Sequence, residues 1–588
     1  MHQENRAGSW HWRSVLPSLP LALSRELPIY LALLLVGAFS AWPSLLPTVE
    51  GLTWDEIEYI YSGRTLLSWQ LPVFEWNPLV AFYYAGFVLP LLKHPNWLVL
   101  AARCGHVLLF GASFLTACLL GRKLDQWMPS WALPTLFVVS RVPAGLLYNS
   151  TDALYSILSG LALWQFLSWL DRRLDRHIVG ASLFSGLAAW SRNDGLLLVF
   201  VLGAVLLVAS MHSHAPLKAT LRSCLAFAIP AGALIAGYLA LYWGVSGTFH
   251  LGTLERSYVA FEQGHAVIFA DEYAADNPYR DAISDVRTLF GTPEENGNSV
   301  FRAIRKHPRA YIERVTRLTT TLPRIAVAAY GGSVSLLLFG LAAVGAAYVV
   351  TGPSKKPSVL ILAWFAPLAV YLLFFFRTQY FLLNWYLVLA LSLLGVRCLA
   401  DRGGWRLAWA IGGCGIVVVA VARGSLTWLA LGALAAMLPI LVSWAARASS
   451  PTPSHFPFVA AIIFVILLSR PVEGSGRIVD AAGTSEVEEA AAWLRGNLPS
   501  HSRVAAYQPH VARLADMDFY WLVQVDNPGE LAAWISTRDI AAVYSDNYLR
   551  DLDPNLQTAV DSLVDRCLRI SFKTRNATIL TPIGNCGP

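Results

Sequence analysis

The fold is decided by residues 28–64, where the apolar run PIYLALLLVGAFSAWPSLL (28–46) leads into the polar segment GLTWDEIEYIYSGR (51–64). An apolar run of this length is typical of a transmembrane helix, for which about 20 residues suffice. Acidic and aromatic side chains follow it directly: Trp54, Asp55, Glu56, Glu58 and Tyr59. The sequence therefore predicts a spanning helix that brings a carboxylate-rich segment to one surface of a bilayer.

The composition of the whole chain agrees with a membrane protein. Of its 588 residues, 55% are hydrophobic and 14% are charged, whereas soluble domains carry about 25% charged residues. This composition excludes disordered, fibrous and nucleic-acid-binding proteins and argues against a soluble enzyme. The net charge of +6 is therefore interpreted through the positive-inside rule, and no nucleic acid partner is expected.

Apolar runs predict an α-helical polytopic protein with about thirteen transmembrane helices. After 28–46, the spans are expected at about 96–121, 131–148, 152–170, 177–191, 194–210, 223–245, 326–351, 357–376, 379–397, 407–422, 425–444 and 456–470. The short run 77–92 is interpreted as an interfacial helix, because omitting it from the spans places the basic connections together on the cytoplasmic side. This topology makes residues 47–95 and 246–325 outer loops.

Three regions are expected along the chain. Residues 1–27 form a cytoplasmic N-terminus, and 28–470 form the transmembrane domain. Residues 471–588 form a small extracytoplasmic α/β domain, because EVEEAAAWLRGNLP (486–499) has helical periodicity and SRVAAY (502–507) and IAAVYS (540–545) read as short strands. Whether Cys567 and Cys586 form a disulfide in this domain stays open.

Polar residues at the outer ends of the spans are the candidates for chemistry. Asp55 is suited to act as a general base towards a hydroxyl group, and Glu56 could orient it or hold a cation. The alternative is that this acidic pair caps the start of a helix or lies in a solvated loop. Asp152, in YNSTDALYSILSG (148–160), is either a site residue or a helix cap. Arg192, in SRND (191–194), either binds a phosphate or belongs to a tight turn.

Two further candidates are weaker patterns. Arg377 and Tyr380 lie in RTQYFLLNWY (377–386), which is either part of the site or an interfacial anchor. A divalent metal is a possible cofactor, with Glu75 and His250 or His265 as ligands. All these candidates fall on one side of the membrane, which suggests a site for an anionic lipid headgroup and a polar partner.

The chain resembles the GT-C superfamily of membrane glycosyltransferases, in particular the protein O-mannosyltransferases and the aminoarabinose (lipid A) transferases. The resemblance covers about residues 28–400, in order. It is carried by Trp54-Asp55-Glu56, WNPLVAFYY (76–84), Arg103 in LAARCGHVLLFGASF (100–114), Thr151-Asp152-Ala153-Leu154 and RTQYFLLNWY (377–386).

The resemblance implies an inverting transferase of a bacterial plasma (inner) membrane, with a polyprenyl-phosphate-linked sugar as donor. The acceptor would be a lipid, a glycan or a protein on the extracytoplasmic side, and membrane lipids would surround the chain. The roles it implies are catalysis by Asp55, Glu56 and Asp152, donor phosphate binding by Arg192, Arg256, Arg377 and Tyr380, and acceptor or sugar binding by Trp54, Tyr59 and Glu75. One alternative is an oligosaccharide- or glycolipid-specific enzyme of the same superfamily with a different donor. Another is a transporter or a lipid- or glycan-binding scaffold without transferase activity, although no internal repeat supports a transporter.

Overall fold

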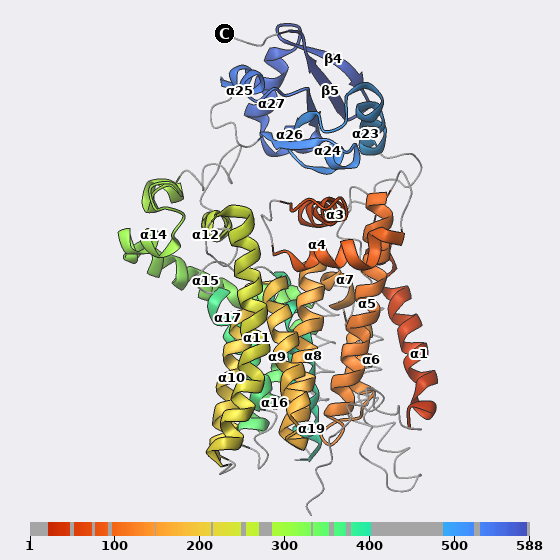
Figure 1. Cartoon of the computed structure of the whole chain (residues 1–588), viewed down its shortest axis with the longest axis vertical. Coiled ribbons are helices and arrows are strands. Elements are labelled where there is room, and N and C mark those ends of the chain that lie inside the picture. Colours follow the sequence, from red (N-terminus) through yellow and green to blue (C-terminus); the bar gives the residue numbers. More distant parts are fainter. Residues whose placement is uncertain are drawn as a thin grey trace, which may run out of the picture.

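The structure is a computed structural model. It describes residues 22–47, 52–72, 77–91, 97–140, 142–147, 149–212, 216–247, 254–269, 285–330, 333–351, 358–371, 378–401, 486–522 and 530–584. The expected spans at 407–422, 425–444 and 456–470 lie outside the described residues. Figure 1 shows a bundle of long helices with a separate mixed domain at one end, which confirms the predicted fold class.

Five helices of the described part are long and apolar enough to cross a membrane. They are α5 (Trp97–Lys123), α8 (Ser150–Arg172), α10 (Asp194–His212), α11 (Leu217–Ser246) and α16 (Ser333–Thr351). They run along the long axis of the bundle in Figure 1. Each overlaps a predicted span, and the ends differ by at most seven residues, because a window of about 20 apolar residues is a strong signal.

Further helices complete the bundle: α1 (Ala22–Ser40), α2 (Trp42–Leu45), α6 (Ala132–Val139), α7 (Val142–Leu146), α9 (Asp175–Ser191), α17 (Ser358–Tyr371), α18 (Thr378–Leu383) and α19 (Trp385–Asp401). The run expected as one span at 131–148 is divided after α6, where Ser140 is extended. Pro143 accounts for the break, since a proline has no N–H to bond the carbonyl four residues earlier, at Val139, and its ring clashes with that carbonyl in a continuous helix. The run 379–397 is likewise divided, at Asn384.

Helices α16 and α19 approach closely enough for their backbones to touch. A Cβ atom added at Gly345 would lie 1.9 Å from the carbonyl oxygen of Leu391, and one added at Gly395 would lie 2.1 Å from that of Leu341. Only glycine fits at these two positions. Small residues allow this kind of helix contact inside a membrane protein.

Several helices lie at the end of the bundle that carries the mixed domain. They are α3 (Trp54–Leu67), α4 (Leu79–Tyr83), the π-helical turn η2 (Tyr84–Val88), the 3₁₀ turn η3 (Leu89–Leu91), α12 (Leu254–Phe269), α14 (Val300–Lys306) and α15 (Pro308–Ala329). Figure 1 shows α4 lying across the axis of the bundle, and it contacts the ends of α8 and α9, as expected for an interfacial helix and not for a span.

The C-terminal domain is a five-stranded sheet with helices packed on it. Its elements are α23 (Glu486–Asn497), β1 (Arg503–Ala506), α24 (His510–Leu514), β2 (Asp518–Trp521), α25 (Leu531–Thr537), β3 (Ala542–Asp546), α26 (Asn547–Leu552), α27 (Pro554–Leu563), β4 (Leu568–Lys573) and β5 (Ala577–Pro582). The strand order is β2-β1-β3-β5-β4. β1 is parallel to β2 and β3, whereas β5 is antiparallel to β3 and β4. The helix and both strands expected from the sequence are present.

Candidate functional site

Helix α3 lies between the bundle and the C-terminal domain and carries Asp55 and Glu56 in its first turn (Figure 1). Thr53 caps this helix, and its side-chain oxygen accepts a hydrogen bond from the backbone N–H of Glu56 at 3.1 Å. Acidic residues in the first turn also suit the positive end of the helix dipole. The local sequence TWDE therefore fixes where α3 begins and where the two carboxylates lie.

Glu56 is completely buried and binds the start of α8. Its Oε2 atom accepts the backbone N–H of Ser150 at 2.9 Å, and its Oε1 atom accepts the Ser150 hydroxyl at 2.6 Å. The hydroxyl of Tyr84 also donates to Oε1, and Nε2 of His106 lies 3.5 Å from it. Glu56 thus ties α3 to three neighbouring elements, η2, α5 and α8.

These contacts decide the ionisation of Glu56. Burial acts to raise the pKa of its carboxyl group, but the contact with His106 and the hydrogen bonds from Ser150 and Tyr84 outweigh it. The resulting pKa lies below the ordinary value for glutamate. The side chain is therefore an ionised hydrogen-bond acceptor inside the protein, which suits a residue that positions α3.

Asp55, in contrast, is partly exposed. Nδ2 of Asn149 lies 3.4 Å from its Oδ2 atom, and the other end of the Asn149 amide caps α8 by accepting the backbone N–H of Thr151 at 3.0 Å. The Asp55 and Asp152 carboxylates lie close enough to repel each other. The structure therefore brings together two of the predicted acidic residues.

Tyr59 lies one turn further along α3 and is buried. Burial raises the pKa of its phenol well above the ordinary value, and the charges of Asp55 and Asp152 add to that shift. Tyr59 therefore keeps its proton at neutral pH and can act as a hydrogen-bond donor beside the two carboxylates.

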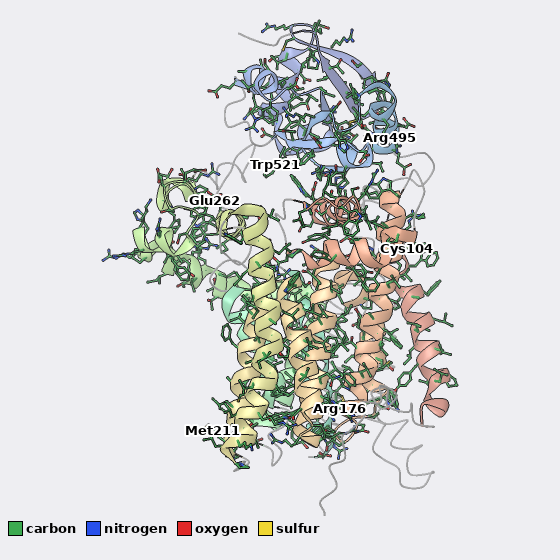
Figure 2. All side chains as sticks on the ribbon, in the orientation of Figure 1. Cys104, Arg176, Met211, Glu262, Arg495 and Trp521 are labelled. Carbon is green, nitrogen blue, oxygen red and sulfur yellow. The ribbon has the colours of Figure 1, made fainter. Side chains whose placement is uncertain are left out.

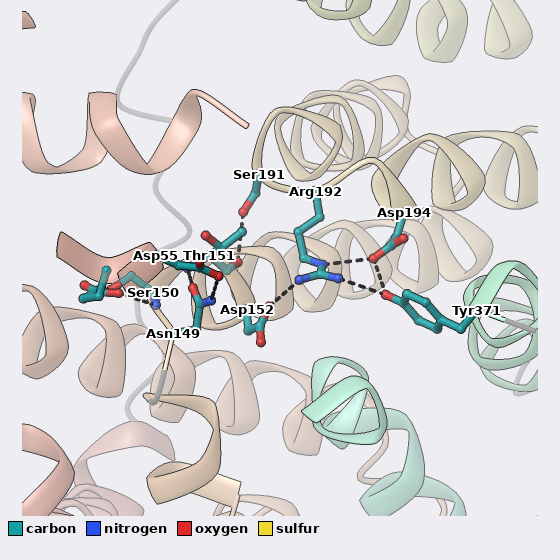
Figure 3. A network of polar contacts seen from close by, with 10 residues as sticks. Asp55, Asn149, Ser150, Thr151, Asp152, Ser191, Arg192, Asp194 and Tyr371 are labelled. Carbon is teal, nitrogen blue, oxygen red and sulfur yellow. Dashed lines mark hydrogen bonds and ion pairs between the residues drawn. The ribbon is translucent and has the colours of Figure 1, made fainter. Parts of the chain in front are cut away.

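Arg192 lies between two carboxylates at the ends of α8, α9 and α10 (Figure 3). Its Nη1 atom lies 2.5 Å from Oδ1 of Asp152, and its Nε atom lies 2.9 Å from Oδ2 of Asp194. Nη2 donates to the hydroxyl of Tyr371 at 3.4 Å, and that hydroxyl donates to Asp194. Only 17% of the Arg192 side chain is exposed, so this network is largely shielded from solvent.

Tyr380 contacts the same network through its ring. It stacks on Tyr371 with 4.2 Å between ring centroids, and the Arg192 guanidinium lies 5.4 Å from the centre of the Tyr380 ring. A guanidinium group has five N–H donors, and the three contacts above use three of them. These contacts thus leave up to two N–H groups of Arg192 unused.

The C-terminal domain packs directly on α3. The Trp54 ring meets Phe519 and Trp521 edge to face, with centroid separations of 5.3 and 5.0 Å. Arg513 forms a two-pronged ion pair with Glu58, at 2.9 and 3.1 Å. Trp54, predicted to contact the acceptor or the sugar, thus packs against β2 of the C-terminal domain.

A polar cleft of about 480 Å³ opens where α3 meets this domain. Its lining includes Glu58, Tyr61 and Arg64 from α3 and Arg513, Asp516 and Asp518 from the domain. A second ion pair, between Arg64 and Asp516 at 3.1 Å, crosses it. The cleft therefore lies between α3 and the C-terminal domain, and its lining does not include Asp55.

The Glu58–Arg513 ion pair allows a direct test of this docking. We expect Arg513→Ala to weaken the packing of the C-terminal domain on α3 by about 1.5–3 kcal/mol, because hydrogen bonds to a charged group are lost and Glu58 stays half-buried. The checks are thermal unfolding and proteolysis of the C-terminal domain in the full chain. The exchange Glu58→Arg with Arg513→Glu should recover part of the loss, whereas Arg503→Ala, on an exposed arginine of the same domain, should change little.

Several of the predicted site residues are not described by the structure. Glu75, Arg377 and His250 are not among the described residues, and Arg256 lies in α12 without a described side chain. Cys586 is also outside the described residues, so whether it pairs with Cys567 stays open. Within the described part of the chain, no group of three His, Cys, Asp or Glu residues is arranged to hold a metal ion. His265 is buried and stacks on Phe269.

Sequence reasoning missed part of the network. Asp194 stands in the SRND segment, and a second carboxylate two residues from an arginine was a usable signal. His106 was another, because an ionisable residue within a predicted span is by default a functional candidate. Tyr371 gave no signal, since a tyrosine near the end of an apolar run is also what an interfacial anchor looks like.

Comparison with solved structures identifies the fold. The chain matches the apo crystal structure of the Archaeoglobus fulgidus oligosaccharyltransferase with a TM-score of 0.51 and 14% identity, covering 91% of this chain and 72% of that one. It matches the crystal structure of ArnT from Cupriavidus metallidurans bound to undecaprenyl phosphate with a TM-score of 0.50 and 13% identity, covering 96% of this chain and 100% of that one.

No protein-family model and no curated protein sequence matches the chain. The two solved structures are therefore informative through their architecture, a polytopic membrane domain followed by a C-terminal domain. This architecture agrees with the one predicted above from the sequence. The chain has the same fold as these two solved structures, an archaeal oligosaccharyltransferase and ArnT.

Proposed function

We propose that this protein is a glycosyltransferase that moves a sugar from a polyprenyl phosphate to an acceptor at the membrane surface beneath its C-terminal domain. The observation that carries the proposal is the position of Asp55: a partly exposed carboxylate beside the buried Asp152–Arg192 pair, at the end of a spanning bundle. The fold shared with ArnT, whose crystal structure contains undecaprenyl phosphate, supports a lipid-linked donor.

In this reaction Asp55 acts as the base, and the neighbouring residues position it, the cation and the substrates. Asp55 takes the proton from the acceptor hydroxyl or amine as that atom bonds to the anomeric carbon of the sugar. The bond from the anomeric carbon to the phosphate oxygen breaks on the opposite face, so the configuration is inverted and polyprenyl phosphate leaves. Glu56 positions α3, and Asp152 positions Arg192. Trp54, Tyr59 and Glu75 are the proposed contacts of the acceptor or the sugar.

Cations near the leaving group lower the barrier by stabilising the charge that develops on the phosphate. Arg192, Arg256 and Arg377 are the proposed cations, with Tyr380 beside them. Arg192 fits this role because its contacts with Asp152, Asp194 and Tyr371 fix the guanidinium in place and leave up to two N–H groups for phosphate.

The distribution of basic residues supports the orientation of the protein. Six basic residues lie at the helix ends opposite to Asp55: Arg122, Lys123, Arg172, Arg176, Lys218 and Arg222. By the positive-inside rule that end is cytoplasmic. We therefore place the protein in the plasma (inner) membrane with the C-terminal domain and the site on the extracytoplasmic side.

The test is to identify the donor. The purified full chain, reconstituted in lipid, is incubated with a panel of polyprenyl-phosphate-linked sugars and with lipid, glycan and peptide acceptors. Mass spectrometry should show one donor converted to free polyprenyl phosphate, together with a glycosylated acceptor. Binding of a donor by the folded protein with no conversion under any acceptor would contradict a transferase and favour a binding scaffold.

A further inference from the structure

A second pocket lies at the opposite end of the bundle from Asp55. It has a volume of about 690 Å³, is lined by both charged and apolar side chains, and lies between the α8–α9 turn and the facing ends of α10 and α11. Figure 2 shows Arg176 and Met211 at this end, far from Trp521 of the C-terminal domain. The pocket is therefore separate from the proposed catalytic site.

The charge of this pocket is positive. Three arginines line it, Arg173, Arg176 and Arg222, against one carboxylate, Asp175. Asp175 pairs with Arg222 at 2.5 Å. Among the residues that the structure describes, no carboxylate lies within salt-bridge distance of Arg173 or Arg176. The lining thus carries an excess of positive charge that attracts an anion.

The backbone and an aromatic ring hold Arg173 in place. Arg173 has a left-handed backbone (φ 54°) and ends α8, where its N–H donates to the carbonyl oxygen of Trp169 at 2.7 Å. Its guanidinium lies over the Trp169 ring, 4.4 Å from the ring centre. A guanidinium that stacks through its face keeps its N–H edge for hydrogen bonds, and that edge suits the oxygens of a phosphate group.

The pocket lies beside an exposed apolar surface, which suits the acyl chains of a lipid. The hydroxyl residues Thr220 and Ser223 of α11 complete the polar lining. Large apolar side chains on α10 and α11 beside it are exposed on the protein surface: Val208, Met211, Leu217, Leu221 and Leu225. A phosphate among the arginines would therefore place acyl chains along an apolar helix surface.

We propose that this pocket binds the phosphate headgroup of an anionic phospholipid in the leaflet opposite to the catalytic site. Basic pockets between transmembrane helices recognise such headgroups through charge and hydrogen bonds. The assignment is independent of the transferase activity, since the pocket and the site share no described residue.

The test is native mass spectrometry of the purified full chain, titrated with phosphatidylglycerol or with phosphatidylcholine of the same acyl chains. We expect phosphatidylglycerol to bind more tightly than phosphatidylcholine. In the double variant Arg173→Gln with Arg176→Gln, the affinity for phosphatidylglycerol should fall by about fivefold for each arginine removed, because a basic residue near a lipid surface contributes about 1 kcal/mol. Arg397→Gln, an exposed arginine at the same end that pairs with Asp401, is the matched control and should bind as the unmodified chain does.

The outcomes separate the sources of the phosphate. Equal binding of both lipids, or equal loss in the Arg397→Gln control, would overturn the proposal. Inorganic phosphate is titrated in parallel, and displacement of phosphatidylglycerol by millimolar phosphate would assign the pocket to a free anion instead of a lipid. Thermal unfolding in lipid-free detergent verifies that the double variant folds. Arg222→Gln provides a second measurement if it does not.

Discussion

Replacing Asp55 by asparagine is expected to lower the rate of sugar transfer by roughly 10²- to 10⁴-fold, the usual contribution of a general base. The amide keeps the size of the side chain and its place at the start of α3 but cannot accept the proton of the acceptor. The fold should survive, because Asp55 is partly exposed and α3 is held by the buried Glu56. Donor consumption measured by mass spectrometry gives the rate, and thermal unfolding verifies the fold.

A matched control separates catalysis from a general loss of charge. Asp171 lies at the other end of α8, where it pairs with Lys123, and Asp171→Asn makes the same chemical change far from the site. The control variant should transfer sugar at the normal rate. If Asp55→Asn were as active as this control, Asp55 would not be the base, and a different carboxylate such as Asp152 would have to take that role.

The membrane-spanning part was predictable because its signal is local. Each long helix depends on its own window of apolar residues, as for α5 and α10, and needs no knowledge of its neighbours. The two ends of the bundle could also be assigned to the two sides of the membrane, since basic residues such as Arg172 and Arg176 accumulate at one end. The expected span at 131–148 failed in detail because Pro143 interrupts the helix, an effect that averaging over a window conceals.

The site could be predicted only as a set of residues on one surface. That Asp152 and Arg192 belong to the same region followed from topology, but their direct ion pair depends on the packing of α8 against α9. The different surroundings of Asp55 and Glu56 were invisible in the sequence, since neighbouring acidic residues on a helix point in directions about 100° apart. One faces the partly open site, and the other faces Ser150 and Tyr84.

Replacing Arg192 by methionine is expected to destabilise the protein by roughly 3–5 kcal/mol, the usual cost of leaving a buried charge without its partner. The change removes the positive charge between Asp152 and Asp194, which are only 3% and 8% exposed. Methionine has a similar length, so loss of volume contributes little. Thermal or denaturant unfolding in detergent measures the effect, and sugar transfer should be lost as well.

Two comparisons establish that charge is the cause. Adding Asp152→Asn and Asp194→Asn to Arg192→Met should recover much of the stability, because a neutral set replaces the uncompensated carboxylates, while transfer should remain lost. Arg397→Met breaks an exposed ion pair with Asp401 and should cost no more than about 0.5 kcal/mol. If the triple variant were no more stable than Arg192→Met alone, the loss would come from packing around Tyr371 and Tyr380. The buried carboxylates would then not be what Arg192 stabilises.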